Sequence, residues 1–400
     1  MPVFPTRDDI HLLDGQFYAG DPFPHYAWMR EHAPVFWDAQ SQLWAVTRHA
    51  DVMQLSKRPD VFCSRHSSRP DAPAIPSMIN LDDPEHRQRR ALVSKGFTPR
   101  RVQDHEPRIR AICAGLLERA RERQRFDFVH DVAAPLPMIV IGDLLGIEEA
   151  DHDRLLRWSD DLICGLSATA PVELMLKAGQ AFEEYAEYHR HVVAARRATP
   201  RGDDLMSVLV HAEIDGERLD DEALLQESLL ILVGGDETTR HVISGGMHAL
   251  LRNPDQLRRL SENPAGVPRA VEEMLRWVSP IQNMNRTAAQ DVVLHGETIH
   301  AGDKVILLYP AANRDAAVFR DPERFDAARD PNPHVAFGGY GAHFCLGASL
   351  ARLEMRVMFE ELVQRLPNLA LASDEPPPLR PSNFIVGIES LPVVVSSRAA

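Results

Sequence analysis

Apolar residues recur at helical spacing along most of the chain, and this pattern predicts a mainly α-helical protein. Long amphipathic runs fill residues 100–210, interrupted by short polar or Gly- and Pro-containing stretches. Residues 135–145 are apolar on nearly every side, which is typical of a helix buried in the core. The longest run covers residues 220–253 and ends before Pro254. A helix of that length would span roughly 50 Å and cross a whole domain.

Strand patterns are short. Residues 34–38 and 43–48 are typical of a hairpin, and further strands are expected at residues 285–288, 292–295 and 304–309. Other helices are expected at residues 24–33, 266–278 and 348–366. No linker, charge block or repeat marks a domain boundary, although length alone would allow two or three domains. We therefore expect one large domain over residues 1–400, mainly α with small β-sheets.

The charge of the chain excludes one class of partner. With 44 Lys+Arg against 58 Asp+Glu the formal net charge is −14, so a nucleic acid would be repelled. The four cysteines show no disulfide or CxxC spacing, which is typical of a reducing compartment. The first residues carry no signal-peptide pattern, and no apolar run reaches the roughly 18 residues of a membrane span. A soluble, cytoplasmic protein is expected.

A glycine-rich stretch delivers one cysteine to the start of a predicted helix. Residues 337–347 read Phe-Gly-Gly-Tyr-Gly-Ala-His-Phe-Cys-Leu-Gly. A thiolate at Cys345 would be stabilised by the unpaired N–H groups and the positive dipole end of that helix. Gly347 would let the backbone approach the sulfur closely. Such a thiolate suits a metal ligand, but a buried free cysteine on a glycine loop is an equal alternative at this point.

The centre of the longest predicted helix is unusual. Gly234 and Gly235 each destabilise a helix by about 1 kcal/mol, and Glu237 and Thr238 follow in an otherwise apolar run. The glycines leave room for a close approach, while a carboxylate beside a hydroxyl can carry a proton inward. A kink with threonine bonded to carbonyl groups is the alternative, but it leaves the buried acid unexplained.

Three weaker patterns have both functional and ordinary interpretations. His86 and Arg90 share one helix face, which suits a carboxylate or phosphate ligand or an ordinary solvated basic face. Residues 62–82 have neither periodicity, so they form a binding loop or a surface loop. Glu273 and Arg276 are three residues apart on a predicted helix, and such pairs are usually surface pairs.

In this order and spacing, these features together resemble the haem-thiolate monooxygenases, cytochrome P-450, along essentially the whole chain. The cysteine loop is the most specific feature, followed by the Gly-Gly-x-acid-Thr segment and the Glu-x-x-Arg pair. The resemblance implies the cytochrome P-450 fold, with haem b between the long central helix and the helix after the cysteine loop. It also implies O₂ as co-substrate and NAD(P)H electrons that arrive through redox partners.

Each motif takes a role within this resemblance. Cys345 is expected to be the axial thiolate ligand of the haem iron, where its electron donation favours O–O cleavage. Cationic side chains at four positions are expected to bind the haem propionates, namely His86, Arg90, Arg286 and His343. Glu237 and Thr238 match the acid–alcohol pair beside dioxygen. Thr238 is expected to hydrogen-bond the oxygen and organise a water molecule, which Glu237 would link to bulk solvent.

Two further features concern the cysteine loop itself. Glu273, Arg276 and Arg324 match a buried ion network that locks this loop in place. One departure from the family pattern is the position of Phe337, which lies eight residues before Cys345 where the family usually has seven. The longer loop leaves the packing of Phe337 beneath the sulfur open.

Within the family, the chain is similar to soluble bacterial enzymes that oxidise the terminal methyl (C26/C27) of the cholesterol or cholest-4-en-3-one side chain. The expected substrate-pocket residues are mainly aliphatic and uncharged, which suits a sterol but also another lipid or a terpenoid. These residues are Ile75, Met78, Ile79, Val233, Gly234, Ile281, Asn283 and Ile385.

Electrons are expected from a ferredoxin and a ferredoxin reductase, because the chain carries no flavin or iron–sulfur domain of its own. Five arginines would form a basic patch for an acidic ferredoxin, or are ordinary surface residues: Arg89, Arg100, Arg101, Arg352 and Arg356. A monomer is expected. A non-catalytic haem sensor or carrier and a peroxygenase are the alternatives, and the Glu237–Thr238 pair argues against both.

Overall fold

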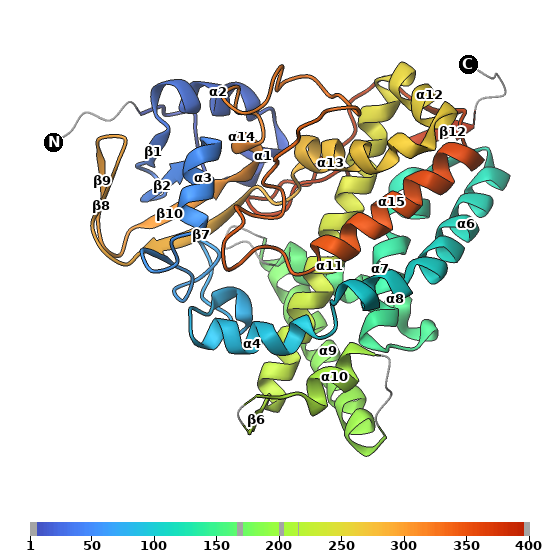
Figure 1. Cartoon of the computed structure of the whole chain (residues 1–400), viewed down its shortest axis with the longest axis horizontal. Helices are drawn as coiled ribbons and strands as arrows, with labels where there is room; N and C mark the ends of the chain where they lie inside the picture. Colours follow the sequence, from blue (N-terminus) through green and yellow to red (C-terminus); the bar gives the residue numbers. More distant parts are fainter. Residues whose placement is uncertain (1–5, 166–170, 200–203, 215, 396–400) are drawn as a thin grey trace. The chain divides into compact units, whose positions relative to one another are not determined.

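The computed structural model describes residues 6–165, 171–199, 204–214 and 216–395 (Figure 1). Helices dominate and the strands form small sheets, so the predicted fold class is confirmed. The chain divides into two compact units, each built from three stretches of sequence. Unit 1 comprises residues 1–74, 241–345 and 375–389, and unit 2 comprises residues 75–240, 346–374 and 390–400. The single domain over residues 1–400 stays a prediction.

Unit 1 is built around a five-stranded sheet in the order β1-β2-β10-β7-β3. Its strands are β1 (Val35–Asp38), β2 (Leu43–Val46), β3 (Phe62–Cys63), β7 (Asn283–Ala288) and β10 (Lys304–Leu308). All neighbouring strands are antiparallel except β2 and β10, which run parallel. A two-stranded hairpin of β8 (Val292–Leu294) and β9 (Glu297–Ile299) lies between β7 and β10 in the chain.

Alternation along these strands builds two apolar clusters. Trp44 and Val305 belong to one cluster, with side chains of α3 (His49–Ser56). Their neighbours Ala45 and Ile306 belong to the other, with side chains of α1 (Gly15–Ala19) and α2 (Phe23–His32). The remaining helices of unit 1 are α12 (Pro254–Glu262), α13 (Val267–Val278) and α14 (Tyr309–Ala312).

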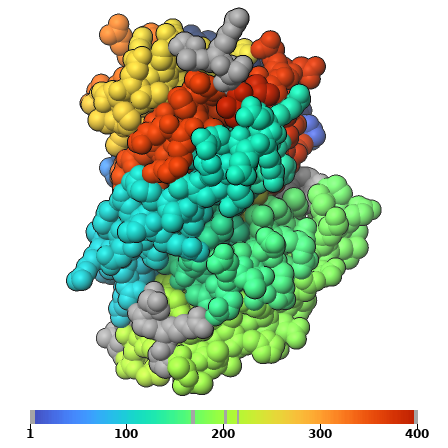
Figure 2. Space-filling view, turned by 90° about the vertical axis from the view of Figure 1, so that its right-hand side faces the viewer, coloured from blue at the N-terminus to red at the C-terminus, as the bar shows by residue number. Residues whose placement is uncertain are grey.

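Unit 2 is mainly helical. Its helices are α4 (Glu85–Ser94), α5 (Pro99–Asp104), α6 (Glu106–Arg123), α7 (Pro135–Leu145), α8 (His152–Cys164), α9 (Val172–Ala198), α10 (Leu205–His211) and α15 (Ala348–Arg365). Two small sheets complete it: β11 (Leu369–Leu371), β12 (Pro392–Val395) and β4 (Arg125–Asp127) form one, and β5 (Glu213–Ile214) and β6 (Glu217–Arg218) the other. Helices α15 and α6 lie side by side (Figure 2).

The longest helix, α11 (Asp221–Leu251), continues without a break through Gly234 and Gly235. Its residues up to Arg240 belong to unit 2 and the rest to unit 1. The long helix predicted over residues 220–253 is therefore confirmed, and the glycines do not interrupt it.

The other predicted elements lie within a few residues of their expected bounds. Helix α7 has the predicted bounds and is buried on nearly every side, and the predicted hairpin is formed by β1 and β2. Residues 62–82 are irregular, as expected, apart from β3 and one 3-10 turn, Met78–Asn80. Across the described ranges, no helix combines the length and the apolar character that crossing a membrane requires.

Candidate active site

The residues singled out from the sequence form two sets. Unit 1 contains Glu273, Arg276, Ile281, Asn283, Arg286, Arg324, His343, Cys345 and Ile385. Unit 2 contains Ile75, Met78, Ile79, His86, Arg90, Val233, Gly234, Glu237 and Thr238. Unit 1 therefore carries the expected thiolate, and unit 2 carries the expected acid–alcohol pair.

Cys345 is the exposed cysteine of the chain. Cys63 and Cys113 are buried, and Cys164 is half-buried. The backbone N–H of Cys345 donates to the carbonyl oxygen of Phe337 at 3.0 Å and closes the loop. Cys345 is therefore accessible, and the alternative of a buried free cysteine is wrong.

Two glycines allow the cysteine loop to lie directly against α3. A Cβ on Gly341 would overlap the carbonyl group of Ser56, and a Cβ on Gly339 would overlap the Ser56 side chain. A side chain at either position would therefore push the loop off the helix. At Gly347 a Cβ would meet no heavy atom of the described residues within 4 Å, and the close approach of its backbone to the sulfur stays a prediction.

Two cations expected to bind propionates lie in unit 1 with Cys345. Arg286 on β7 is buried, and its Nη1 donates to the carbonyl oxygen of Asn285 at 2.7 Å. Burial raises the pKa of the Tyr309 phenol, and the positive charge of Arg286 opposes that rise. His343 is half-buried two residues before the cysteine.

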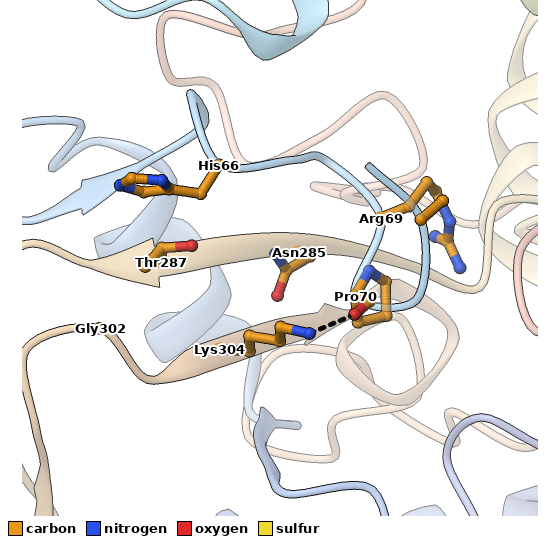
Figure 3. A pocket seen from close by; sticks show the side chains of 8 residues that line it. His66, Arg69, Pro70, Asn285, Thr287, Gly302 and Lys304 are labelled. Atoms are coloured by element: carbon orange, nitrogen blue, oxygen red, sulfur yellow. Dashed lines mark hydrogen bonds between the residues drawn. The ribbon is translucent and has the colours of Figure 1, made fainter. Parts of the chain in front are cut away.

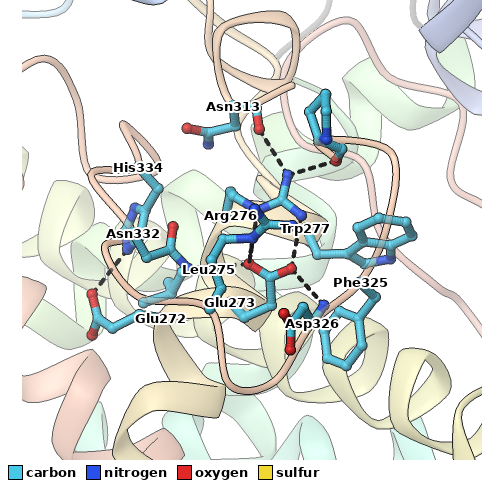
Figure 4. A network of polar contacts seen from close by, with 12 residues as sticks. Glu272, Glu273, Leu275, Arg276, Trp277, Asn313, Phe325, Asp326, Asn332 and His334 are labelled. Atoms are coloured by element: carbon cyan, nitrogen blue, oxygen red, sulfur yellow. Dashed lines mark hydrogen bonds and ion pairs between the residues drawn. The ribbon is translucent and has the colours of Figure 1, made fainter. Parts of the chain in front are cut away.

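The Glu-x-x-Arg pair of α13 is fully buried and is not a surface pair (Figure 4). Arg276 donates from Nε and Nη2 to the two carboxylate oxygens of Glu273, both at 2.7 Å. Its Nη1 donates to the carbonyl oxygens of Asn313 and Pro322, each at 2.9 Å. One helical ion pair thereby fixes the irregular stretch that precedes the cysteine loop.

The third charged member of this network differs from the prediction. Arg329 donates from Nε to Glu273 at 3.0 Å, and Asn332 adds a bond from Nδ2 at 3.1 Å. The side chain of Arg324 is exposed, and its carbonyl oxygen accepts from Arg276 at 3.2 Å. The assignment of Arg324 is therefore wrong. The chain bends so that Arg329, not Arg324, turns inward.

His86 and Arg90 share one face of α4 in unit 2, as the spacing predicts. His86 is buried, and its Nδ1 lies 3.5 Å from Asp83 Oδ1. Burial lowers the pKa of His86, and the neighbouring charge of Arg90 lowers it further. The lowered pKa favours the neutral imidazole of His86, so Arg90 is the permanent cation of this face.

Glu237 is fully buried on α11 and forms an ion pair with Arg240, three residues along the same helix. Arg240 also donates from Nη1 to Asp160 Oδ1 of α8 at 2.9 Å. Burial raises the pKa of Asp160, and the positive charge of Arg240 opposes this rise. The negative charge of Glu237 and hydrogen bonding with its carboxyl group raise the pKa of Asp160 further. Sequence reasoning missed Arg240 and Asp160, although the i, i+3 spacing signals the arginine.

Asp236 is a second buried acid beside this group. Its Oδ2 accepts from the Ser159 hydroxyl at 2.9 Å, and Oδ1 has no hydrogen-bond partner in the described residues. Burial raises the pKa of Asp236 to about 8, although the charge of Arg240 opposes the rise. Asp236 is therefore mainly protonated at neutral pH, and Glu237 is the carboxylate that neutralises Arg240.

The two glycines and the threonine of α11 have different neighbours. A Cβ on Gly235 would overlap the side chain of Ile141 on α7, so this glycine allows the two helices to pack. A Cβ on Gly234 would meet no described heavy atom within 4 Å, which agrees with the predicted open space. Thr238 donates from its hydroxyl to the carbonyl oxygen of Gly234 at 2.9 Å.

The expected substrate residues are only partly exposed. In unit 2, Met78 is buried, Ile79 and Val233 are half-buried, and Ile75 is 41% exposed. In unit 1, Ile281 and Ile385 pair through an isolated β-bridge.

Asn283 does not fit the role of a substrate contact. Its Oδ1 accepts from Arg69 at 3.0 Å, and its Nδ2 donates to the Tyr18 hydroxyl and the Asn383 carbonyl oxygen at 3.2 and 2.8 Å. The amide is fully buried and used within the protein. We therefore interpret Asn283 as a structural residue, which corrects its assignment to the pocket.

A hollow of about 280 Å³ in unit 1 is not the expected apolar pocket (Figure 3). None of its lining residues was predicted to contact substrate: they are His66, Arg69, Pro70, Ala72, Asn285, Thr287, Gly302 and Lys304. Lys304 donates to the carbonyl oxygen of Pro70 at 2.7 Å across it. A polar wall of this kind does not suit a sterol.

The five arginines of the expected basic patch lie in unit 2 but are not equivalent. Arg356 is held by Glu106 at 2.6 Å and Glu360 at 3.1 Å, and Arg89 donates to the carbonyl oxygen of Pro76 at 3.0 Å. Arg100 and Arg101 lie on α5, which packs beside α15, where Arg352 is half-buried.

The sequence model of the family Cytochrome P450 matches residues 21–395, almost the whole chain. The chain therefore belongs to the cytochrome P450 family, and it is a cytochrome P450 monooxygenase.

Curated relatives and solved structures agree. The steroid C26-monooxygenase of Mycolicibacterium smegmatis is 49% identical over 98% of both chains. The methyl-branched lipid omega-hydroxylase of Mycobacterium bovis is 42% identical over 97% of this chain and 95% of its own. The crystal structure of CYP109E1 from Bacillus megaterium with corticosterone has a TM-score of 0.85 and 35% identity, and covers 94% of this chain and 99% of that one.

Family membership implies a haem iron with a thiolate ligand, and the side chains present fit such a group. Cys345 presents the exposed sulfur. Buried Arg286 suits a propionate, because a buried cation is stable only beside an anion, and the His86 ring can donate a hydrogen bond to a carboxylate. The described residues contain no cluster of three or more His, Cys, Asp or Glu side chains that could hold a metal by themselves.

Proposed function

We propose that this enzyme inserts one oxygen atom of O₂ into the terminal methyl group of a sterol side chain, with cholesterol or cholest-4-en-3-one as substrate. The observation that carries the proposal is the 49% identity to a steroid C26-monooxygenase over 98% of both chains. Aliphatic Met78, Ile79 and Val233 in unit 2 agree with an apolar ligand.

The chain's own residues have distinct proposed roles. When bound, the haem supplies the activation of dioxygen and the transfer of one oxygen atom to carbon. Cys345 would hold the iron, while His86, Arg90, Arg286 and His343 would bind the propionates. In unit 2, the Thr238 hydroxyl already donates to Gly234, so its oxygen lone pairs can accept a hydrogen bond from a water molecule.

The contacts of Glu237 support a proton path from solvent. The Asp160 side chain is 41% exposed, whereas that of Glu237 is fully buried. Burial, and then the charge of Glu237, raises the pKa of Asp160 against the effect of Arg240, so this solvent-facing carboxyl group binds a proton more readily. Arg240 holds both groups in place. A proton can thus enter at Asp160 and reach Glu237, beside Thr238.

Electrons are proposed to come from NAD(P)H through a ferredoxin reductase and a ferredoxin. Of the expected patch, Arg100 and Arg101 on α5 are the proposed contacts, whereas Arg89 and Arg356 already bind Pro76 and Glu106 within the protein. We propose that the enzyme acts as a monomer. We also propose that it acts in the cytoplasm, because its cysteines form no disulfide pattern.

The test is a spin-state titration of the purified holoenzyme. Cholest-4-en-3-one should shift the haem spectrum at low ligand concentration and yield a product hydroxylated at the terminal methyl. Turnover with O₂ and a ferredoxin should greatly exceed turnover with hydrogen peroxide. A sterol that causes no shift, or is hydroxylated on its rings, would contradict the proposal.

A methyl-branched lipid is the second candidate substrate, favoured by the 42% identity to an omega-hydroxylase of such lipids. The same titration with a methyl-branched and an unbranched fatty acid separates the two. Tighter binding and faster turnover of the branched acid than of the sterol would make it the substrate.

A further inference from the structure

A buried carboxylate on α11 holds a loop of unit 2 that the function leaves unexplained. Glu227 is fully buried, and its Oε1 accepts a hydrogen bond from the backbone N–H of Met78 at 2.8 Å. The two residues are 149 positions apart in the chain. Because Met78 begins the 3-10 turn Met78–Asn80 before α4, this bond ties that turn and the loop around it to the long helix.

Arg89 provides a second attachment for the same loop. Its Nη1 donates to the carbonyl oxygen of Pro76 at 3.0 Å and lies 3.5 Å from Glu227 Oε1. The same stretch also contains local bonds, such as the one from Asn80 Nδ2 to the Ile75 carbonyl oxygen at 3.1 Å. Glu227 and Arg89 therefore hold the loop through its backbone on either side of Ser77.

The position of Glu227 on α11 connects this loop to the candidate active site. Gly234 and Thr238 follow it by seven and eleven residues, so all three lie on one face of the helix. The distances along the axis are roughly 10 and 16 Å. A loop attached at Glu227 thus lies along the same helix face as the proposed oxygen-binding stretch.

We propose that Glu227 is a positioning residue that fixes residues 75–80 and thereby sets the affinity of the enzyme for its substrate. The inference rests on the proposed function, in which Ile75, Met78 and Ile79 contact the substrate.

The chemistry of the site explains why a carboxylate is present. An apolar side chain at residue 227 would pack without a desolvation penalty but would leave the Met78 N–H without its acceptor. Glu227 Oε2 has no hydrogen-bond partner in the described residues, so the desolvation of the carboxylate is only partly compensated. The hydrogen bond to Met78 therefore partly offsets the unfavourable burial of the acid.

The same burial makes the attachment sensitive to pH. Burial raises the pKa of Glu227 to about 7, while the Met78 N–H and the charge of Arg89 oppose the rise. Arg89 of α4 is the charged group that faces it; residues 75–80 and the α11 residues 223–231 contain no other titratable side chain. The ionised form accepts the stronger hydrogen bonds. As pH rises from about 6 to 8, Glu227 should therefore bind residues 75–80 more tightly, and the affinity of the enzyme for its substrate should increase.

The experiment measures sterol affinity by spin-state titration of the full-length holoenzyme between pH 6 and 8.5. Glu227→Gln keeps an acceptor oxygen but cannot ionise, so its Kd should match the low-pH wild-type value at every pH. Glu227→Ala should raise Kd about tenfold, as expected for the loss of one hydrogen bond to a charged group, with little change in kcat. The control is Glu222→Gln, an exposed carboxylate on the same helix, which should behave as wild type.

Hydrogen exchange at the Met78 amide in the substrate-free enzyme separates this inference from the proposed function. The amide should exchange faster in Glu227→Ala, and faster in the wild type at pH 6 than at pH 8 once intrinsic exchange rates are corrected. If cholest-4-en-3-one fails to bind the wild type while this exchange pattern holds, the substrate is wrong and the attachment stands. Unchanged exchange in Glu227→Ala, or the same pH-dependent Kd in Glu227→Gln, overturns the inference.

Discussion

At the residue scale, the chemistry depends on side chains whose environments differ sharply within one unit. In unit 2, Glu237 is fully buried and neutralises Arg240, whereas Asp160 is 41% exposed and meets the same arginine from α8. Asp236, one residue from Glu237, is buried and mainly protonated because burial raises its pKa to about 8. Neighbouring acids therefore have different protonation states, so only some of them can carry protons at neutral pH.

Replacing Thr238 with alanine tests the hydroxyl itself. We expect Thr238→Ala to retain haem and substrate affinity while most reducing equivalents are diverted to hydrogen peroxide, because the water is no longer oriented. Peroxide formed per NAD(P)H consumed is the measurement. Thr238→Ser, which keeps the hydroxyl, should remain coupled. A coupled alanine variant would rule out the proposed role.

Removing the acid at the solvent end of the path tests proton entry. We expect Asp160→Asn to lower kcat about tenfold or more, consistent with the loss of one acid–base group, and to increase the solvent deuterium isotope effect. Sterol affinity should not change. Asp161→Asn, at the adjacent half-buried carboxylate, is the matched control. An isotope effect equal to that of the wild type would show that protons enter elsewhere.

At the element scale, buried charged side chains on helices bind backbone groups of irregular segments in both units. The Glu273–Arg276 pair of α13 binds carbonyl groups of the irregular stretch before the cysteine loop, and Glu227 of α11 binds the N–H of Met78. Both use buried charges, which are stable only while every partner is present. These elements therefore tie irregular segments to regular helices through backbone hydrogen bonds.

Arg329 and Arg324 form a matched pair for testing the first attachment. Arg329→Met should destabilise the holoenzyme by about 2 kcal/mol and increase haem loss, because Glu273 loses a buried partner. Arg324→Met should change stability by less than about 0.5 kcal/mol, since only its carbonyl group is used. Chemical unfolding of both variants measures the difference. Equal losses of stability in the two variants would show that the Arg324 side chain belongs to the network.

At the scale of the whole molecule, the charge distribution matters for electron supply. The chain carries a net charge of −14, yet Arg100 and Arg101 lie on α5 beside α15 in unit 2. The strongly acidic chain would repel an acidic ferredoxin, so a local cluster of cations is needed for productive encounter.

Reversing these two charges tests the docking site. Arg100→Glu together with Arg101→Glu should raise KM for the ferredoxin at least tenfold at low salt, with sterol affinity unchanged. The effect should shrink as salt screens the charges. The same reversal at Arg258 and Arg259 on α12 is the control with equal net charge. A similar loss in both double variants would indicate net charge alone.

Much of this molecule was predictable from local patterns. Helices α7 and α11 follow from their apolar periodicity, and Cys345 follows from its glycine-rich loop, since these depend on neighbours within a few residues. Glu227 is an acid in an apolar run, and this local pattern indicates a buried carboxylate with a special role. Its partner Met78 could not be predicted, because the two residues are 149 positions apart.

The sequence by itself determined the family and the order of the elements and predicted the thiolate ligand, because periodicity and motif spacing are local properties of the chain. Only the tertiary structure decided that Arg329 rather than Arg324 reaches Glu273, and that Asn283 is enclosed by Arg69 and Tyr18. These contacts join residues more than 50 positions apart. Their geometry depends on how irregular segments bend and pack, which no local pattern encodes.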